Sequence, residues 1–125
     1  MKSETRRLPD AELEVMQAVW ACTPPVQRAE IEEILKDTHP MAQTTLLTLL
    51  TRLSERGFLK IEKVGRSARY VPLVTKEEYL AEQSRRFFDK LCGGSLSTFA
   101  AALCSSGLTK EEIAELRALM DEGKL

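Results

Sequence analysis

The segment AQTTLLTLLTRLSERG, residues 42–57, has the clearest helical pattern in this chain. Its leucines recur at the i, i+3, i+4, i+7 spacing that places one face of an α-helix against a core; they are Leu46, Leu49, Leu50 and Leu53. The opposite face consists of Thr44, Leu47, Thr48, Thr51 and Glu55. Gly57 is a typical residue just beyond the end of a helix. We therefore expect one helix with a buried leucine face and a free, threonine-rich face.

A β-hairpin is predicted directly after this helix. The segments FLKIEK (58–63) and ARYVPL (68–73) contain aromatic and β-branched residues that favour strands. Between them lies VGRS (64–67), whose Gly65 and Arg66 suit a tight turn. The hairpin brings three cations close together, because Lys63 and Arg69 flank the turn that carries Arg66.

Two further helices are predicted before the segment 42–57. PDAELEVMQAVWAC (9–22) carries apolar residues at helical spacing, and the prolines that follow it end the helix. VQRAEIEEILK (26–36) is the second helix, which ends before His39-Pro40. Three helices and a hairpin within about 75 residues are the plan of a winged helix-turn-helix, whose third helix enters the major groove of DNA. We therefore expect residues 1–74 to form a DNA-binding domain.

The remainder, residues 75–125, is predicted to be helical, so the fold class is mainly α with a small β-hairpin. Thr75 and Thr109 each begin a capping box that starts a helix. This region is too small to fold stably alone, and a second copy is the simplest partner for its apolar residues. The expected dimerisation residues are Leu80, Phe87, Phe88, Leu91, Phe99, Leu103, Ile113, Leu116 and Met120. Packing of this region back on its own winged domain is the alternative.

The charge is distributed unevenly, although the net charge is only −1. Residues 41–72 contain two acidic side chains and the basic side chains Arg52, Arg56, Lys60, Lys63, Arg66 and Arg69. Acidic segments lie on both sides of this basic segment. A local excess of positive charge is typical of a surface that contacts a phosphate backbone.

Other classes of protein find little support in the residues. His39, the single histidine, precedes a proline in a loop, and we see no phosphate-binding loop or catalytic motif. We therefore expect no enzyme activity, no catalytic residue, no metal and no cofactor. No apolar run approaches the roughly 20 residues of a membrane span, and no secretory signal is visible, so we expect a cytoplasmic protein without membrane insertion.

Five segments resemble the penicillinase-repressor family of bacterial transcriptional regulators, the BlaI/MecI/CopY type. They are LPDAELEVMQAVW, TTLLTLLTRLSERGFL, VGRSARYVPL, FFDKLCGGSLSTFAAAL and LTKEEIAELRALM, in the same order and at similar spacing. The resemblance implies a homodimeric repressor that binds a palindromic operator in double-stranded DNA. It places the contacts of the third helix on Gln43, Thr44, Thr45, Leu47, Thr48 and Arg52, and those of the wing on Lys63, Arg66 and Arg69.

The sequence also departs from this family. In the resistance members a membrane-bound zinc metalloprotease sensor triggers cleavage at an Asn-Phe bond, where this chain has Ala102 and Leu103. Release by proteolysis, or by another signal that acts on the C-terminal region, is left open. The Cys-x-Cys pair of the copper-responsive members is not found in DEGKL (121–125), so we expect no copper sensing. Leu47 stands where some relatives have a longer polar side chain, so the operator is expected to differ.

Two other functions are compatible with the residues. A winged helix can be a protein-interaction module that binds no DNA. The chain can also be a thiol- or metal-responsive regulator that uses Cys22, Cys92 and Cys104, although their spacing fits neither a zinc site nor a disulfide framework.

Overall fold

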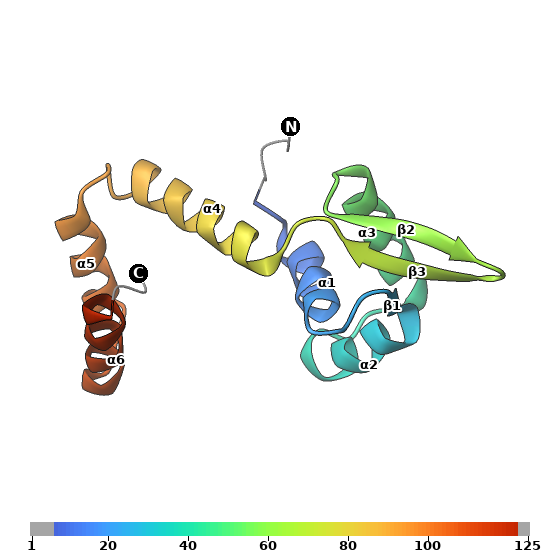
Figure 1. Cartoon of the computed structure of the whole chain (residues 1–125), viewed down its shortest axis with the longest axis horizontal. Helices are drawn as coiled ribbons and strands as arrows, with labels where there is room; N and C mark the ends of the chain where they lie inside the picture. Colours follow the sequence, from blue (N-terminus) through green and yellow to red (C-terminus); the bar gives the residue numbers. More distant parts are fainter. Residues whose placement is uncertain (1–6, 123–125) are drawn as a thin grey trace. The chain divides into compact units, whose positions relative to one another are not determined.

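A computed structural model describes residues 7–122 of the chain. The chain divides into two compact units, Met1–Gln83 and Ser84–Leu125. The N-terminal unit contains α1 (Asp10–Trp20), β1 (Val26–Gln27), α2 (Arg28–Thr38), α3 (Gln43–Glu55), β2 (Leu59–Val64) and β3 (Ser67–Pro72), as Figure 1 shows. Helix α1 packs against both α2 and α3. The succession of three helices and a hairpin agrees with the winged helix-turn-helix plan expected from the sequence.

The sheet contains one strand more than the predicted hairpin. Among residues 7–122 it has three antiparallel strands in the order β1–β3–β2. Strand β1 pairs Val26 with Tyr70 and Gln27 with Arg69, although we expect residues 26 and 27 to begin a helix. That part of the prediction is wrong, because Val26 is completely buried beside β3. Helix α2 instead begins at Arg28. The backbone N–H of the preceding residue, Gln27, donates to Glu30 Oε1 at 2.8 Å.

The leucine face of α3 forms the centre of the core, as predicted. Leu46, Leu49, Leu50 and Leu53 are between 0% and 6% exposed. They belong to one cluster with Val15, Met16 and Val19 of α1 and with Ile31 and Leu35 of α2. The fixed position of this face leaves the opposite side of α3 in contact with solvent.

Replacing Leu53 by alanine should lower the free energy of unfolding by about 2–5 kcal/mol, since the side chain is fully buried and leaves a cavity. Urea unfolding at one fixed protein concentration measures the change. The matched control is Leu47→Ala on the exposed face of the same helix, which should cost about 1 kcal/mol at most. Equal losses for the two variants would contradict the observed orientation of α3.

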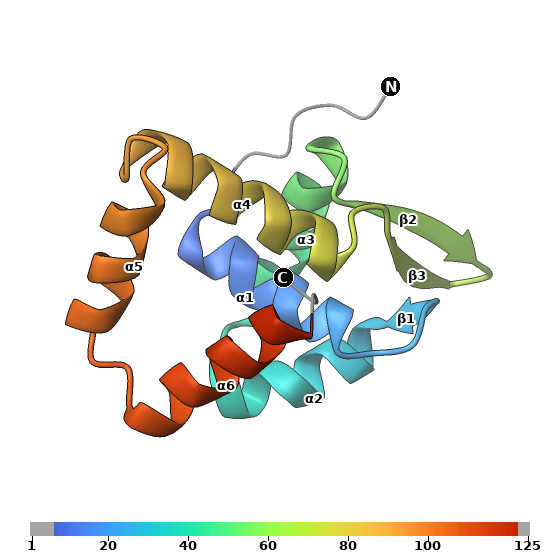
Figure 2. The ribbon, with the colours of Figure 1, turned by 60° about the vertical axis from the view of Figure 1, so that its left-hand side comes forward.

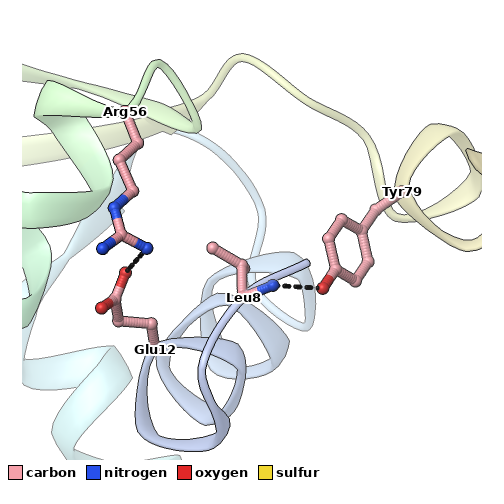
Figure 3. Close-up of polar contacts among 4 residues, drawn as sticks. All are labelled: Leu8, Glu12, Arg56 and Tyr79. Carbon is pink, nitrogen blue, oxygen red and sulfur yellow. Dashed lines mark hydrogen bonds and ion pairs between the residues drawn. The ribbon is translucent and has the colours of Figure 1, made fainter. Parts of the chain in front are cut away.

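Helix α4 (Lys76–Lys90) begins in the N-terminal unit, because its first turns are attached there by Tyr79 (Figure 3). The backbone N–H of Leu8 donates to the Tyr79 hydroxyl at 2.8 Å. The Tyr79 ring lies 5.7 Å from the Trp20 ring and 5.9 Å from the Phe58 ring. The boundary between the two units therefore falls within α4, after Gln83, whereas the sequence suggests a boundary between residues 74 and 75.

The C-terminal unit contains the end of α4, α5 (Leu96–Ser105) and α6 (Lys110–Asp121). The predicted capping box at Thr109 is present, with Thr109 N–H donating to Glu112 Oε1 at 2.9 Å. Phe99 packs edge-on against Phe87 and Phe88, with 5.9 Å between ring centroids in both pairs. Of the side chains described in residues 84–122, only Cys92 is buried. A single copy of this unit thus has almost no core of its own.

The apolar residues expected to form a dimer lie on these helices or, for Leu91, directly after α4, and each described one is exposed or half-buried. Leu80 is 50% exposed, Phe87 41% and Leu91 74%. The others are half-buried, namely Phe88, Phe99, Leu103, Ile113 and Leu116. Met120 lies on α6, but its side chain is outside the described part of the structure. No helix in residues 7–122 is both long and apolar enough to cross a bilayer.

Candidate nucleic-acid interface

The outer face of α3 is open to solvent, as predicted. Every residue expected to contact DNA from this helix is exposed: Gln43, Thr44, Thr45, Leu47, Thr48 and Arg52. The orientation of the helix is supported from behind by a buried carboxylate, because Glu12 of α1 lies 3.0 Å from Arg56 Nη1 at the C-terminal end of α3 (Figure 3). Glu12 is only 3% exposed, whereas the Arg56 side chain is 44% exposed, so the carboxylate is buried and its cation reaches solvent. The ion pair joins α1 to α3 and helps to fix the angle at which α3 presents its outer face.

Two hydroxyl protons on this face, those of Thr48 and Thr51, are already in use. Thr48 Oγ1 donates to the carbonyl of Thr44 at 2.9 Å, and Thr51 Oγ1 donates to the carbonyl of Leu47 at 3.0 Å. A hydroxyl has one proton and two acceptor lone pairs. Both threonines therefore offer an acceptor oxygen and a methyl group to a partner, rather than a donor.

The wing is a regular antiparallel hairpin that extends beyond the helices of its unit (Figure 2). Its pairing runs from Leu59 opposite Pro72 to Val64 opposite Ser67. Gly65 adopts a φ of +62°, a left-handed conformation that favours glycine, and thereby closes the turn in two residues. Arg66 follows directly and is exposed at the tip. The fold thus holds a cation at the farthest point of the hairpin.

A groove of about 620 Å³ lies between α3, the wing and the beginning of α2. The wing cations Lys63, Arg66 and Arg69 line it, together with Leu47 of α3. No carboxylate is found among the described residues that line this groove. Burial raises the pKa of the Tyr70 phenol, an effect that nearby Arg28 opposes. The phenol remains neutral near pH 7, so the groove carries positive charge alone.

The groove brings together only some of the DNA-contacting residues that are expected from the sequence. Leu47 and the three wing cations meet there, while Gln43, Thr44, Thr45, Thr48 and Arg52 lie outside its lining on the exposed part of α3. The two groups are continuous along α3, because Leu47 is in one and the next residue, Thr48, is in the other. A long ligand that follows α3 and crosses to the wing would contact both groups.

Arg28 and Thr51 are among the lining residues that the set predicted from the sequence does not contain. Thr51 belongs to the outer face expected from the sequence, but it is not one of the contacts expected there. Arg28 reaches the groove because β1 pairs with β3 just before it, and a two-residue strand leaves no pattern in the sequence. Its contact with Glu32, at 3.5 Å and well exposed, is a weak surface pair that a stronger anionic partner can displace.

The three cysteines are free thiols in the described part of the structure. Cys22 is half-buried, Cys92 is buried and Cys104 is exposed, and residues 7–122 contain no group of three or more metal-ligating side chains. Burial raises the pKa of the Cys22 thiol, and the carboxylate of Glu30 raises it further. A raised pKa leaves less thiolate, which is the form that reacts with oxidants and metals.

Cys22 should accordingly react slowly with iodoacetamide. We expect alkylation of the folded chain at mildly alkaline pH to be at least about tenfold slower at this residue than in urea, because both burial and the raised pKa reduce the accessible thiolate. Peptide mass spectrometry over time measures the rate. Glu30→Gln should accelerate the reaction, since it removes the carboxylate that is the second cause of the raised Cys22 pKa. Equal alkylation rates in the folded and unfolded chain would contradict this prediction and would favour Cys22 as a sensor.

Known proteins resemble this chain over nearly its whole length. A family model described as penicillinase repressor matches residues 8–122. The penicillinase repressor of Bacillus licheniformis is 30% identical over 119 residues, which cover 94% of this chain and 92% of that protein. The methicillin resistance regulatory protein MecI of Staphylococcus aureus is 30% identical over 125 residues, which cover 98% of this chain and 99% of that protein.

A solved structure is also similar. It is the solution structure of the Bacillus licheniformis BlaI monomeric form in complex with the blaP half-operator. The two share 33% sequence identity with a TM-score of 0.50, and the match covers 63% of this chain and 94% of that one. This likeness confirms the winged helix-turn-helix predicted from the sequence.

Proposed function

The chain belongs to the penicillinase-repressor family, and from this premise we propose that it is a transcriptional repressor that binds double-stranded operator DNA as a homodimer. Members of this family are repressors rather than enzymes, so no catalytic step is assigned to any residue. The observation that carries the proposal is the cationic groove, which is continuous with the free face of α3. A repressor acts beside the chromosome, which in a bacterium places it in the cytoplasm.

In this proposal α3 enters the major groove, where base edges can be distinguished. Its exposed residues Gln43, Thr44, Thr45, Leu47 and Thr48 face the bases and the adjoining backbone, and Arg52 reaches a phosphate. The wing residues Lys63, Arg66 and Arg69, together with Arg28 of α2, neutralise phosphates on the side of the groove. Contacts of this second kind give affinity without sequence preference and weaken as salt is added.

Two protomers are proposed to associate through α4, α5 and α6. The support is the near absence of buried side chains in residues 84–122 of one copy, since helices with exposed apolar faces need a partner to be stable. A two-fold dimer presents two copies of α3 to two halves of a palindrome. Each protomer then raises the effective concentration of the other at its half-site.

Release from DNA is proposed to act on this same region. The bond between Ala102 and Leu103, which matches the cleavage point of the resistance members, lies inside α5. A protease could reach it only after α5 opens locally, which is easiest in a helix with few buried contacts. The structure of α5, with no buried residue, fits this requirement.

The test uses the full chain and a duplex that it selects from a random library. The affinity for this duplex, measured by gel retardation, should fall by a factor of about 10³ or more between about 50 and about 200 mM salt. The reason is that six or more phosphates are neutralised in the dimer. A duplex with the same composition in scrambled order is the control, and should bind far more weakly. A chain that selects no duplex and retards none at low salt would instead be a protein-interaction module.

A further inference from the structure

An exposed leucine occupies the middle of the face that the proposed function turns toward DNA. Leu47 is 36% exposed and lines the groove beside the wing. Its neighbours one turn before and after it are Thr44 and Thr51, and Thr48 adjoins it. None of the four side chains is charged. The centre of α3 therefore has no side chain of the kind that pairs with guanine in the major groove, namely arginine or lysine.

The hydrogen bonds of this face narrow its choice of base further. Guanine presents two acceptors, N7 and O6, and needs a donor opposite them. The hydroxyls of Thr48 and Thr51 donate hydrogen bonds to the carbonyls of Thr44 and Leu47, at 2.9 and 3.0 Å. What remains on Thr48 and Thr51 is one acceptor oxygen each, beside the apolar surface of Leu47. An A·T pair matches both, because adenine offers the N6 amino group as a donor and thymine offers a C5-methyl group.

We propose that Leu47 reads the C5-methyl group of a pyrimidine, supplied by thymine, at one position in each half of the operator. This inference rests on the proposed function, since it assigns a specificity to the same surface. The contact is hydrophobic: the methyl group and the leucine leave water together as α3 enters the groove. Burial of one methyl group is worth about fourfold in affinity per half-site, from about 0.8 kcal/mol.

The test removes the methyl group without altering base pairing. The full chain first selects a duplex from a random library, and each thymine of that duplex is then replaced by deoxyuridine, symmetrically in both halves. At one position the replacement should weaken binding by about 15-fold, the product of two fourfold losses. For Leu47→Ala, the thymine and uracil duplexes should bind within about twofold of one another at that position. Leu73→Ala, at an exposed leucine that does not line the groove, should keep the full discrimination.

5-Methylcytosine carries the same C5-methyl group as thymine. A third duplex shows which of these two bases supplies the methyl group. A pair of 5-methylcytosine with guanine at the sensitive position should bind more weakly than the thymine pair. Its amino donor lies on cytosine N4 instead of on the purine, and guanine presents two acceptors that the threonine oxygens cannot meet. Tighter binding than the thymine pair would overturn the assignment to thymine. The proposal is also overturned if no deoxyuridine weakens binding, or if Leu47→Ala discriminates as well as the natural chain. Failure of the proposed function looks different, because the chain would then select no duplex at all.

Discussion

Ending the chain at Gly94 should lower its affinity for a full palindromic operator by a factor of about 10² to 10⁴. The shortened chain keeps the whole N-terminal unit and all of α4, but it loses α5 and α6. If two protomers associate through the lost helices, the second half-site is no longer bound at a high effective concentration. Each N-terminal unit then binds its half-site independently, with only its own phosphate contacts.

A single half-site is the matched control for this experiment. The full and shortened chains should bind it with similar affinity, since either uses one copy of α3 and one wing there. Fluorescence anisotropy of labelled duplexes measures both affinities, and sedimentation reports whether the shortened chain is a monomer. A shortened chain that binds the palindrome as tightly as the full chain would contradict the proposed role of residues 84–125.

Replacing Lys63, Arg66 and Arg69 together by alanine should nearly abolish binding near physiological salt. The triple variant removes six cations from the dimer, and each neutralised phosphate contributes about 0.9 to the slope of log affinity against log salt. Between about 50 and about 200 mM salt, the affinity of the natural chain for the duplex should therefore fall by a factor about 10³ larger than the affinity of the variant does. The two chains should differ most at low salt, where counterion release is strongest.

An equal change in charge elsewhere separates this contact from a general effect of net charge. Lys36, Lys76 and Lys110 are exposed and lie outside the groove lining, so their replacement by alanine removes the same charge from other surfaces. This second triple variant should keep the salt dependence of the natural chain. Identical slopes for the two triple variants would mean that the wing holds no phosphates.

The features of the fold that depend on local periodicity were predictable from the sequence. Leu46, Leu49, Leu50 and Leu53 recur at helical spacing and are buried. The hairpin forms where strand-forming residues surround Gly65. The capping box at Thr75 is present, with Glu78 N–H donating to Thr75 Oγ1 at 3.0 Å. Each of these is decided by residues close together in the chain.

The features that depend on distant residues were not predictable. Strand β1 exists because Val26 pairs with Tyr70, and that pairing brings Arg28 into the groove. Tyr79 belongs to the N-terminal core because it accepts a hydrogen bond from Leu8, which is remote in sequence. The use of the threonine protons within α3 is a matter of side-chain conformation, which the residue type alone leaves undecided.

The surface that meets DNA can be mapped directly by following the backbone amide signals of the full chain in NMR spectra as the selected duplex is added. The signals of α3 from Gln43 to Arg52 and of the wing from Lys63 to Arg69 should change most, while those of buried α1 residues such as Val15 should change little. Shifts concentrated on any other face, with α3 and the wing unaffected, would contradict the assignment of this surface to duplex DNA.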